Sequence, residues 1–275
     1  FSLLILILGV SPLLAPTLGG FIAADYGWKP IFYLLAIIGA IILLVSWRFL
    51  PEGHQPDTRV SLKPGPILRT FLSVLRNPIF HTYTFAGAFS FATLFIYVAG
   101  SPVIFMEIFH VSPEVYGGIF ALLSVSFIGG SQMNILLTRR YPSAKLFAFA
   151  LMCQVIVSFI FVIGVRNEWF GLYSTIGMFF LALGCIGICN PNANALAISP
   201  FTRNVGSASA LLGCTQIGVA ALASSGVALF KASDMLPIVC LMAGTATVAL
   251  IIHTWGKRSI TAAITASPRT DPPMH

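Results

Sequence analysis

Apolar runs of about twenty residues follow one another through this chain, and they constrain its fold more than any other feature. Each of eight such runs is long enough to cross the roughly 30 Å hydrocarbon core of a membrane as an α-helix. They cover approximately residues 1–24, 30–50, 79–100, 116–137, 144–165, 170–189, 205–230 and 235–255. Only 8% of the 275 residues are charged, against roughly 25% in a water-soluble domain. The sequence therefore predicts an all-α polytopic membrane protein with eight transmembrane helices.

The charged residues between the runs predict which helix ends face the cytoplasm. Twelve of the 15 Lys and Arg residues fall on one side of the eight-span arrangement, and Lys29, Arg166 and Lys231 fall on the other. Most of the Asp and Glu residues share the side of those three. Because basic residues accumulate in cytoplasmic loops, the basic side is predicted to be cytoplasmic. This distribution accounts for the net charge of +7 without nucleic acid as a partner.

This orientation divides the chain into four parts. Residues 1–50 hold two spans, residues 51–78 form a cytoplasmic loop, residues 79–258 hold six spans, and residues 259–275 are expected to be a disordered cytoplasmic tail. Within the loop, "PILRTFLSVLR" places its apolar residues mostly on one helical face. That pattern suits either a helix in the membrane interface or an ordinary cytoplasmic linker helix.

The chain begins with Phe1 inside an apolar run, and neither a basic segment nor a small-residue cleavage site precedes that run. The first run is therefore expected to span the membrane rather than to act as a signal peptide. Further coding sequence is expected upstream of it.

Four motifs resemble those of one transporter family. The first, "SPLLAPTLGG" at residues 11–20, is similar to the antiporter motif in the fifth span of drug/proton antiporters, in the spelling common among Bcr/CflA drug-resistance transporters. The others are "AGSPVIFMEIFHVSPEVYG", "NPNANALA" and "VGSASALLGCTQ", at residues 99–117, 190–197 and 205–216. All four stand in the family's order. The resemblance implies the twelve-span fold of the major facilitator superfamily, with spans five to twelve in this chain and the first four absent.

The resemblance also implies an activity and a location. The complete protein is expected to export small amphipathic drugs or metabolites across the bacterial inner membrane, as a monomer in the lipid bilayer with a cytoplasmic C-terminus. The expected energy source is the proton gradient rather than a bound cofactor. The family's proton-coupling carboxylate lies in its first span, which this chain lacks. Because the truncated cavity would lack most of one wall, a transport-inactive remnant or scaffold is the alternative.

The antiporter motif is expected to act where the two halves of the transporter meet. Proline bends a membrane helix, and small residues allow helices to approach closely. The residues concerned are Pro12, Ala15, Pro16, Gly19 and Gly20. On the resemblance they help to seal one side of the cavity while the other opens, and ordinary close packing of helices is the alternative.

Uncharged polar and aromatic residues indicate a candidate substrate cavity. Every Asp, Glu, Lys and Arg maps to a loop or a span end, so the lining is expected to be neutral. The candidate residues are Ser90, Phe91, Thr93, Tyr97, Ser124, Phe127, Asn190 and Gln216. Such a lining suits a broad pocket for amphipathic molecules. In the alternatives, the serines and threonines bond to their own helix, and the asparagines of "NPNAN" cap the sixth span.

Small residues predict further packing contacts. Gly206, Ser209 and Gly213 have a spacing that suits a tight helix contact at the cytoplasmic end of the seventh span. Cys185 and Cys189 lie one helical turn apart, and without a partner His or second Cys pair they are interpreted as packing residues rather than metal ligands. An enzyme within the membrane would need an Asp pair, a Ser/His pair or a metal-binding set inside the spans, and the sequence offers none.

Overall fold

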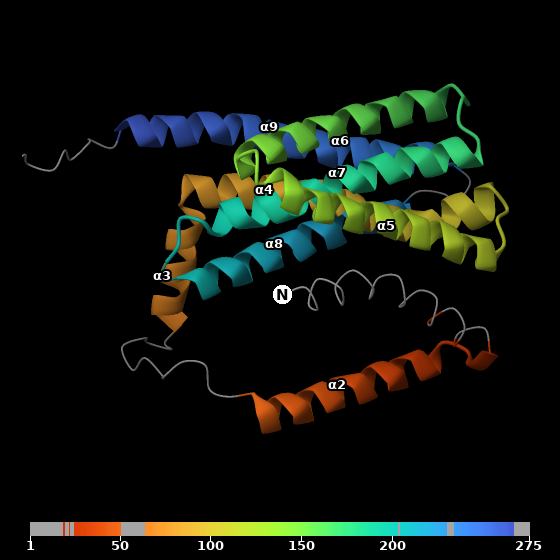
Figure 1. Ribbon diagram of the computed structural model, residues 1–275, viewed down its shortest axis with the longest axis horizontal. Coiled ribbons are helices and arrows are strands. Elements are labelled where there is room, and N and C mark those ends of the chain that lie inside the picture. Colours follow the sequence, from red (N-terminus) through yellow and green to blue (C-terminus); the bar gives the residue numbers. More distant parts are fainter. Residues whose placement is uncertain are drawn as a thin grey trace, which may run out of the picture. The chain divides into compact units, whose positions relative to one another are not determined.

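The structure is a computed structural model that describes Gly19, Ile22 and residues 25–50, 64–202, 204–229 and 234–266. Seven of the described helices are long and apolar enough to cross a membrane (Figure 1). The predicted all-α polytopic membrane fold is thus confirmed, with seven of its eight spans. The predicted first span, 1–24, lies outside the described residues except for two isolated positions. The chain falls into two compact units, residues 1–67 and 68–275.

The first unit contains α2, Lys29–Phe49. Pro30 stands in its first turn, where a missing N–H costs nothing, and Arg48 stands in its last turn, where a cation suits the helix dipole. No residue of α2 is buried within this unit. A helix that is apolar on all sides is stable when lipid or other helices surround it, so α2 has the character of a membrane span.

The helix predicted within the 51–78 loop is present as α3, Pro64–Leu75. Val74 of α3 is fully buried and packs with Phe80 in the core of the second unit. Leu68 and Leu72 lie one turn apart and are exposed. Leu75 also packs against this core. The end of the helix is therefore attached to the bundle, and its contact with the membrane interface stays a prediction.

Six described helices form the bundle of the second unit. They are α4 (Pro78–Pro102), α5 (Pro113–Leu137), α6 (Ser143–Arg166), α7 (Leu172–Ile198), α8 (Val205–Ser225) and α9 (Leu236–Ala266). The two central helices are α4, which packs against α7, α8 and α9, and α7, which packs against α4, α5 and α6. Figure 1 shows α6 and α9 along one side of this pair and α5 and α8 along the other.

Short polar residues and prolines set the starts of two of these helices. Asn77 precedes α4, and its Oδ1 accepts hydrogen bonds from the backbone N–H groups of Ile79 and Phe80 at 3.0 and 3.2 Å. Ser112 accepts similarly at the start of α5. Each of these caps is followed directly by a proline, which fits the first helical position.

The helix α4 extends beyond its predicted end at Gly100. It passes through Pro102 and continues as a π-helix, Val103–Ile108. Because proline has no N–H, the carbonyl of Val98 loses its helical donor, and the hydroxyl of Ser101 donates to it at 3.3 Å instead. The interruption is thus satisfied locally, as a membrane helix requires.

Two more helices are longer than predicted. The predicted sixth span ends at Cys189, whereas α7 runs on through Pro191 to Ile198. The predicted eighth span ends at Trp255, whereas α9 continues to Ala266. The expectation of a disordered tail is therefore wrong for residues 259–266. Their sequence, "SITAAITA", contains neither Gly nor Pro to interrupt a helix.

The core of the bundle has two apolar clusters with a polar layer between them. The first contains Tyr97, Phe105, Phe161 and Phe179 among its large side chains. The second contains Phe80, Phe147 and Leu151. Along α4, Ser90 and Thr93 lie between the residues of the two clusters and are buried. The predicted cavity residues Ser90 and Thr93 therefore lie in the polar layer between the two apolar clusters.

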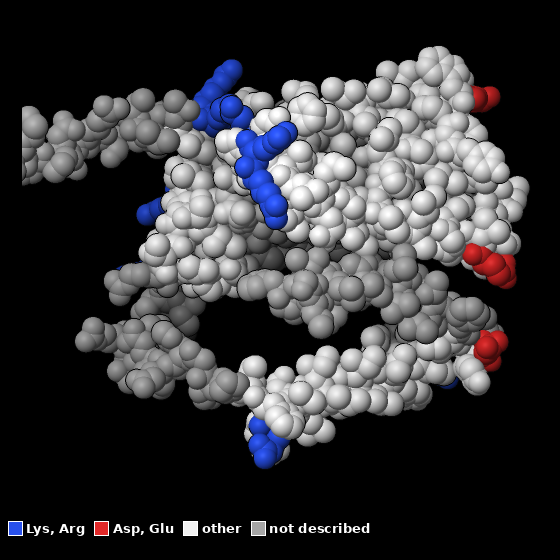
Figure 2. All heavy atoms as spheres, in the orientation of Figure 1, with Lys and Arg blue, Asp and Glu red and all other residues white. Residues whose placement is uncertain are grey.

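Charges of opposite sign gather at opposite ends of the second unit (Figure 2). The turn between α5 and α6 carries Arg139 and Arg140. Figure 1 shows this turn at the end of the bundle toward which α9 runs, with Lys257 and Arg258 in the last third of that helix. The opposite turns carry Glu107, Glu114, Glu168 and Asp234, together with Arg166. The separation that the sequence predicted along the chain is thus present in space.

Candidate functional site

Two of the predicted cavity residues, Ser90 and Thr93, lie inside the bundle and bind Gln154 of α6. Ser90 Oγ donates to Oε1 of Gln154 at 2.6 Å. Nε2 of Gln154 donates to the backbone carbonyl of Ser90 at 3.2 Å and to Thr93 Oγ1 at 3.0 Å. All three side chains are buried. In this structure they cross-link α4 and α6 rather than face an open cavity.

This hydrogen-bond network is closed. Thr93 Oγ1 lies 3.1 Å from Thr245 Oγ1 of α9, and the Thr245 hydroxyl donates to the carbonyl of Met242 at 3.0 Å. Because Thr93 accepts from Gln154, its own hydrogen is left to donate to Thr245. Gln154 has both amide hydrogens and its carbonyl oxygen engaged, which removes the cost of burying it. A glutamine within the apolar run 144–165 was the sequence signal for this partner, because such a residue is costly unless paired.

Tyr97, another predicted cavity residue, is also buried in the core of the bundle. Its ring packs between Phe120 and Phe179, with ring centroids 5.9 and 5.0 Å away. Its buried hydroxyl makes no hydrogen bond within the described part of the chain. One turn further along α4, Ser101 pairs with the hydroxyl of Tyr116 at 2.9 Å. Tyr97 thus contributes aromatic packing between α4, α5 and α7.

Three other predicted residues, Phe91, Ser124 and Phe127, are half-buried. Phe91 packs against the first core cluster and meets Phe95 edge to face at 5.5 Å. Ser124 Oγ donates to the carbonyl of Phe120 at 2.9 Å, so for this serine the own-helix alternative holds. These residues are accessible from outside the bundle, on the α4 and α5 helices.

Small residues bring the backbones of α5 and α7 into contact. A Cβ added to Gly130 would collide with the carbonyl of Gly184, and one added to Gly187 would collide with the carbonyl of Phe127. Beside them, Ser126 Oγ donates to a backbone carbonyl of α7 at 2.5 Å. Such approaches drive helix association in membranes, where the hydrophobic effect does not.

The tight contact predicted at Gly206, Ser209 and Gly213 is not made within the described part of the chain. A Cβ added to Gly206 or Gly213 would meet no atom within 4 Å. Ser209 is exposed. The spacing of small residues shows where a helix can be approached closely, but it does not show which face has a neighbour. In the described bundle, the close backbone contact is between α5 and α7 instead.

The asparagines of "NPNAN" do not cap a helix, because α7 continues past them. Nε2 of Gln216 in α8 donates to Oδ1 of Asn190 at 3.2 Å and to Oδ1 of Asn194 at 2.7 Å. From the other side of α7, Nδ2 of Asn192 donates to Oδ1 of Asn134 in α5 at 2.6 Å. The prediction of a cap is therefore wrong, and two predicted substrate residues, Asn190 and Gln216, lie in direct contact.

Asn190, Asn194 and Gln216 are hereafter the amide cluster. Gln216 is 8% exposed, and the two asparagines are half-buried. The cluster joins α7 to α8, and these helices otherwise make few contacts with each other. It is the place in the described bundle where predicted substrate residues from different helices come together with polar groups still accessible.

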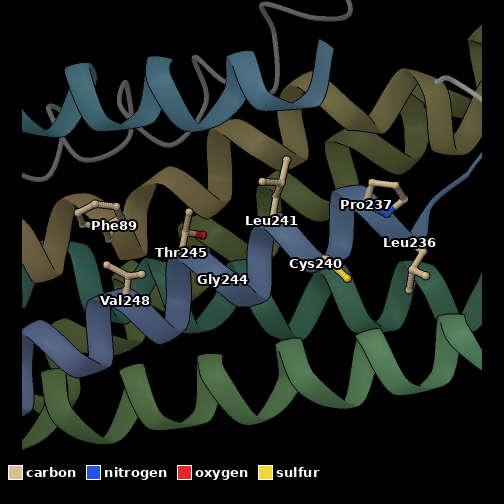
Figure 3. Close-up of a pocket in the computed structure, with 8 residues that line it drawn as sticks. All are labelled: Phe89, Leu236, Pro237, Cys240, Leu241, Gly244, Thr245 and Val248. Carbon is tan, nitrogen blue, oxygen red and sulfur yellow. The ribbon is translucent and has the colours of Figure 1, made fainter. Parts of the chain in front are cut away.

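An apolar groove of about 530 Å³ lies elsewhere in the second unit (Figure 3). Its lining residues are Phe89 of α4 and Leu236, Pro237, Cys240, Leu241, Gly244, Thr245 and Val248 of α9. The Thr245 hydroxyl is already bonded to the Met242 carbonyl. A ligand site needs a few convergent polar groups that fix orientation, so this groove is a weaker candidate than the amide cluster.

The antiporter motif lies mostly outside the described residues, which leaves the placement of Pro12, Ala15, Pro16 and Gly20 undetermined. A Cβ added to Gly19 would meet nothing within 4 Å. The gating role of the motif therefore stays a prediction.

Among the described residues, no group of three His, Cys, Asp or Glu side chains is arranged to hold a metal ion. Cys189 is fully buried, with its Sγ 3.9 Å from the carbonyl of Phe147, which agrees with a packing role.

Comparisons with known proteins identify the family. Residues 1–225 match the model of the Major Facilitator Superfamily. The chain is 25% identical over 252 residues to the bicyclomycin resistance protein homolog of Haemophilus influenzae, covering 92% of this chain and 63% of the relative. It is 28% identical over 255 residues to the uncharacterized MFS-type transporter YdgK of Bacillus subtilis, covering 90% of this chain and 62% of that relative. It is 28% identical over 210 residues to the multidrug resistance protein MdtL of Escherichia coli, covering 76% and 51%.

The chain therefore spans between half and two thirds of the length of these relatives. The family match extends over more than half of the chain, and it agrees with the bundle of membrane-spanning helices. The chain belongs to the Major Facilitator Superfamily.

Proposed function

We propose that the complete protein exports small amphipathic drugs or metabolites across the bacterial inner membrane in exchange for protons. The family match over residues 1–225 carries the proposal. Two of the relatives bear names that state resistance to bicyclomycin and to multiple drugs. The protein acts as a monomer in the lipid bilayer, and the proton gradient rather than a bound cofactor supplies the energy.

The geometry of the second unit supports an amphipathic substrate. The flanking helices α5 and α8 are less buried than the central α4 and α7. Half-buried aromatic side chains, Phe91 and Phe127, and the amide cluster combine apolar surface with uncharged polar groups. Aromatic surface with a few oriented polar groups is the usual lining of a small-molecule site.

The proposal also covers proton coupling and the orientation of the protein in the membrane. Proton exchange requires a titratable group in the transport path, and each Asp and Glu of the described spans lies near a span end. The coupling carboxylate is therefore expected in another part of the complete protein. This expectation agrees with the family, whose coupling carboxylate lies in the first span. The separation of charges in Figure 2 supports a cytoplasmic C-terminus.

Accumulation of test compounds in cells checks the proposal. Bacteria that lack their own drug exporters receive the complete gene or an empty vector, and uptake of neutral and cationic fluorescent compounds is followed with and without an uncoupler. Expressing cells should accumulate less of at least one compound, and the uncoupler should abolish the difference. Equal accumulation across a broad panel, at a confirmed level of protein in the membrane, favours the transport-inactive remnant instead.

A further inference from the structure

The second unit contains two buried glutamines in opposite situations. Gln154 uses both of its amide hydrogens and its carbonyl oxygen within the bundle. Gln216 uses its two amide hydrogens on Asn190 and Asn194, and its Oε1 makes no hydrogen bond within the described part of the chain. This Oε1 is not one of the described side-chain atoms that are both fully buried and unpaired, so it is accessible to water or to a ligand. The network of Gln154 is therefore complete, and the amide cluster of Gln216 is open.

The unused groups of the amide cluster are both donors and acceptors. Besides Oε1 of Gln216, the Nδ2 groups of Asn190 and Asn194 make no hydrogen bond within the described residues. Turning all three amides over keeps both hydrogen bonds between them and exchanges donors for acceptors. In either orientation the cluster presents at least one donor and one acceptor to a ligand.

The position of Gln216 along α8 indicates the depth at which it lies. Gln216 is eleven residues beyond Val205, the first residue of α8. At 1.5 Å per residue this places it about 16 Å along the helix, roughly half the thickness of the hydrocarbon core. Substrate sites of secondary transporters lie near this depth. At this depth, an open polar group needs either water in a cavity or a ligand.

We propose that the amide cluster binds an uncharged hydrogen-bonding group of the transported compound, such as a carbonyl, amide or hydroxyl, and so selects for neutral polar function rather than for positive charge. The inference rests on the proposed export function for the identity of its ligand. No Asp or Glu accompanies the cluster, because the acidic residues of the described spans lie near span ends. A cation therefore gains no ion pair from the described residues there, whereas a neutral carbonyl or amide completes the unused hydrogen bonds.

Binding of three matched probes to the purified complete protein in lipid nanodiscs tests the site. The probes are 1-phenyl-2-pyrrolidinone, an uncharged aromatic lactam, 1-phenylpyrrolidine, which lacks the carbonyl, and the cation tetraphenylphosphonium. Equilibrium dialysis should show the lactam binding about tenfold more tightly than 1-phenylpyrrolidine, the factor that one hydrogen bond to a buried group supplies. Wild-type protein that binds the lactam and 1-phenylpyrrolidine equally overturns the proposal.

Variants of the cluster separate a ligand contact from a structural role. The lactam carbonyl only accepts a hydrogen bond, so the test has to remove the donors of the cluster in either orientation of its amides. The triple variant Asn190→Ala, Asn194→Ala, Gln216→Leu should remove the about tenfold preference for the lactam and leave the affinity for 1-phenylpyrrolidine within about twofold. The matched control is Thr215→Val, because the neighbouring Thr215 hydroxyl bonds to Leu211 of its own helix at 2.8 Å, and this variant should keep the preference. An equal loss of affinity for the lactam and for 1-phenylpyrrolidine in the triple variant contradicts a specific contact. The double variant Asn190→Ala, Asn194→Ala, with the same expected loss of preference, provides the test if the triple variant does not reach the membrane.

The site and the export function fail in distinguishable ways. Protein that prefers the lactam but supports no uncoupler-sensitive efflux keeps the amide cluster as a binding site and refutes drug export. Protein that exports drugs but shows no preference among the probes refutes the amide cluster alone.

Discussion

The substitution Gly187→Ala adds one methyl group where α7 touches α5. That Cβ would collide with the carbonyl oxygen of Phe127 and lie 3.0 Å from the backbone nitrogen of Ser131. Both are backbone atoms, so no rotation of a side chain relieves the collision. The two helices must move apart, which also stretches the nearby hydrogen bond between Asn192 and Asn134.

A matched substitution isolates the size of this effect. Overpacking a close contact typically costs about 1–3 kcal/mol, while replacing Gly by Ala inside a helix gains about 0.5–1 kcal/mol. Gly213→Ala in α8 should gain the same helix-propensity stabilisation, and its added Cβ would meet no atom within 4 Å. Gly187→Ala should therefore be less stable than Gly213→Ala by about 1–3 kcal/mol.

Thermal unfolding of the purified complete protein, followed by intrinsic fluorescence, measures the difference. At roughly 2–4 °C per kcal/mol, the midpoint of Gly187→Ala should fall several degrees below that of Gly213→Ala. Equal midpoints refute the close approach of α5 and α7 as the cause. If Gly213→Ala is the less stable variant, the contact predicted from the sequence around Gly206 and Gly213 is made with a segment outside the described residues.

Three further outcomes are expected. Gln154→Ala should lower the free energy of unfolding by about 1–3 kcal/mol, because it leaves the buried Ser90 hydroxyl unpaired, whereas Gln132→Ala at an exposed position should change the unfolding midpoint little. Cysteines introduced after Arg140 should react with a membrane-impermeant maleimide only in permeabilised cells, and those after Glu114 in intact cells, since basic loops face the cytoplasm; the reverse labelling contradicts the topology. Gly20→Leu in the antiporter motif should reduce active efflux or open a proton leak at a normal level of protein, because a few kcal/mol shifts a two-state equilibrium, and normal transport without a leak makes the motif ordinary packing.

The existence of the seven described spans could be predicted from the sequence, because each is a long apolar segment that only a helix can carry through lipid. The start of α4 was predicted to within one residue, after Pro78, whereas α5 begins at Pro113, three residues before its predicted start, because Ser112 and Pro113 form a helix start there. The ends were predicted poorly at Pro102 and Pro191. A proline ends a helix in water but is tolerated where neighbouring groups satisfy the freed carbonyl, and that depends on the surroundings rather than on the local sequence.

The partners of the polar residues were decided by the tertiary structure alone. Helical periodicity placed Ser90 and Thr93 on one face of α4, but only the packing of α6 shows that this face meets Gln154, 64 residues away from Ser90. The reason is that periodicity fixes which residues share a face, while the neighbour of that face depends on how all the helices assemble.

The "NPNAN" motif shows the same division within five residues. Its spacing already places Asn190 and Asn194 on one side of a helix and Asn192 on the other, since four residues make about one turn and two make about half a turn. The folded bundle then sets Gln216 of α8 against one side and Asn134 of α5 against the other. Local geometry thus determined the two faces, and long-range packing determined that one face is locked to α5 while the other keeps hydrogen-bonding groups open to a ligand.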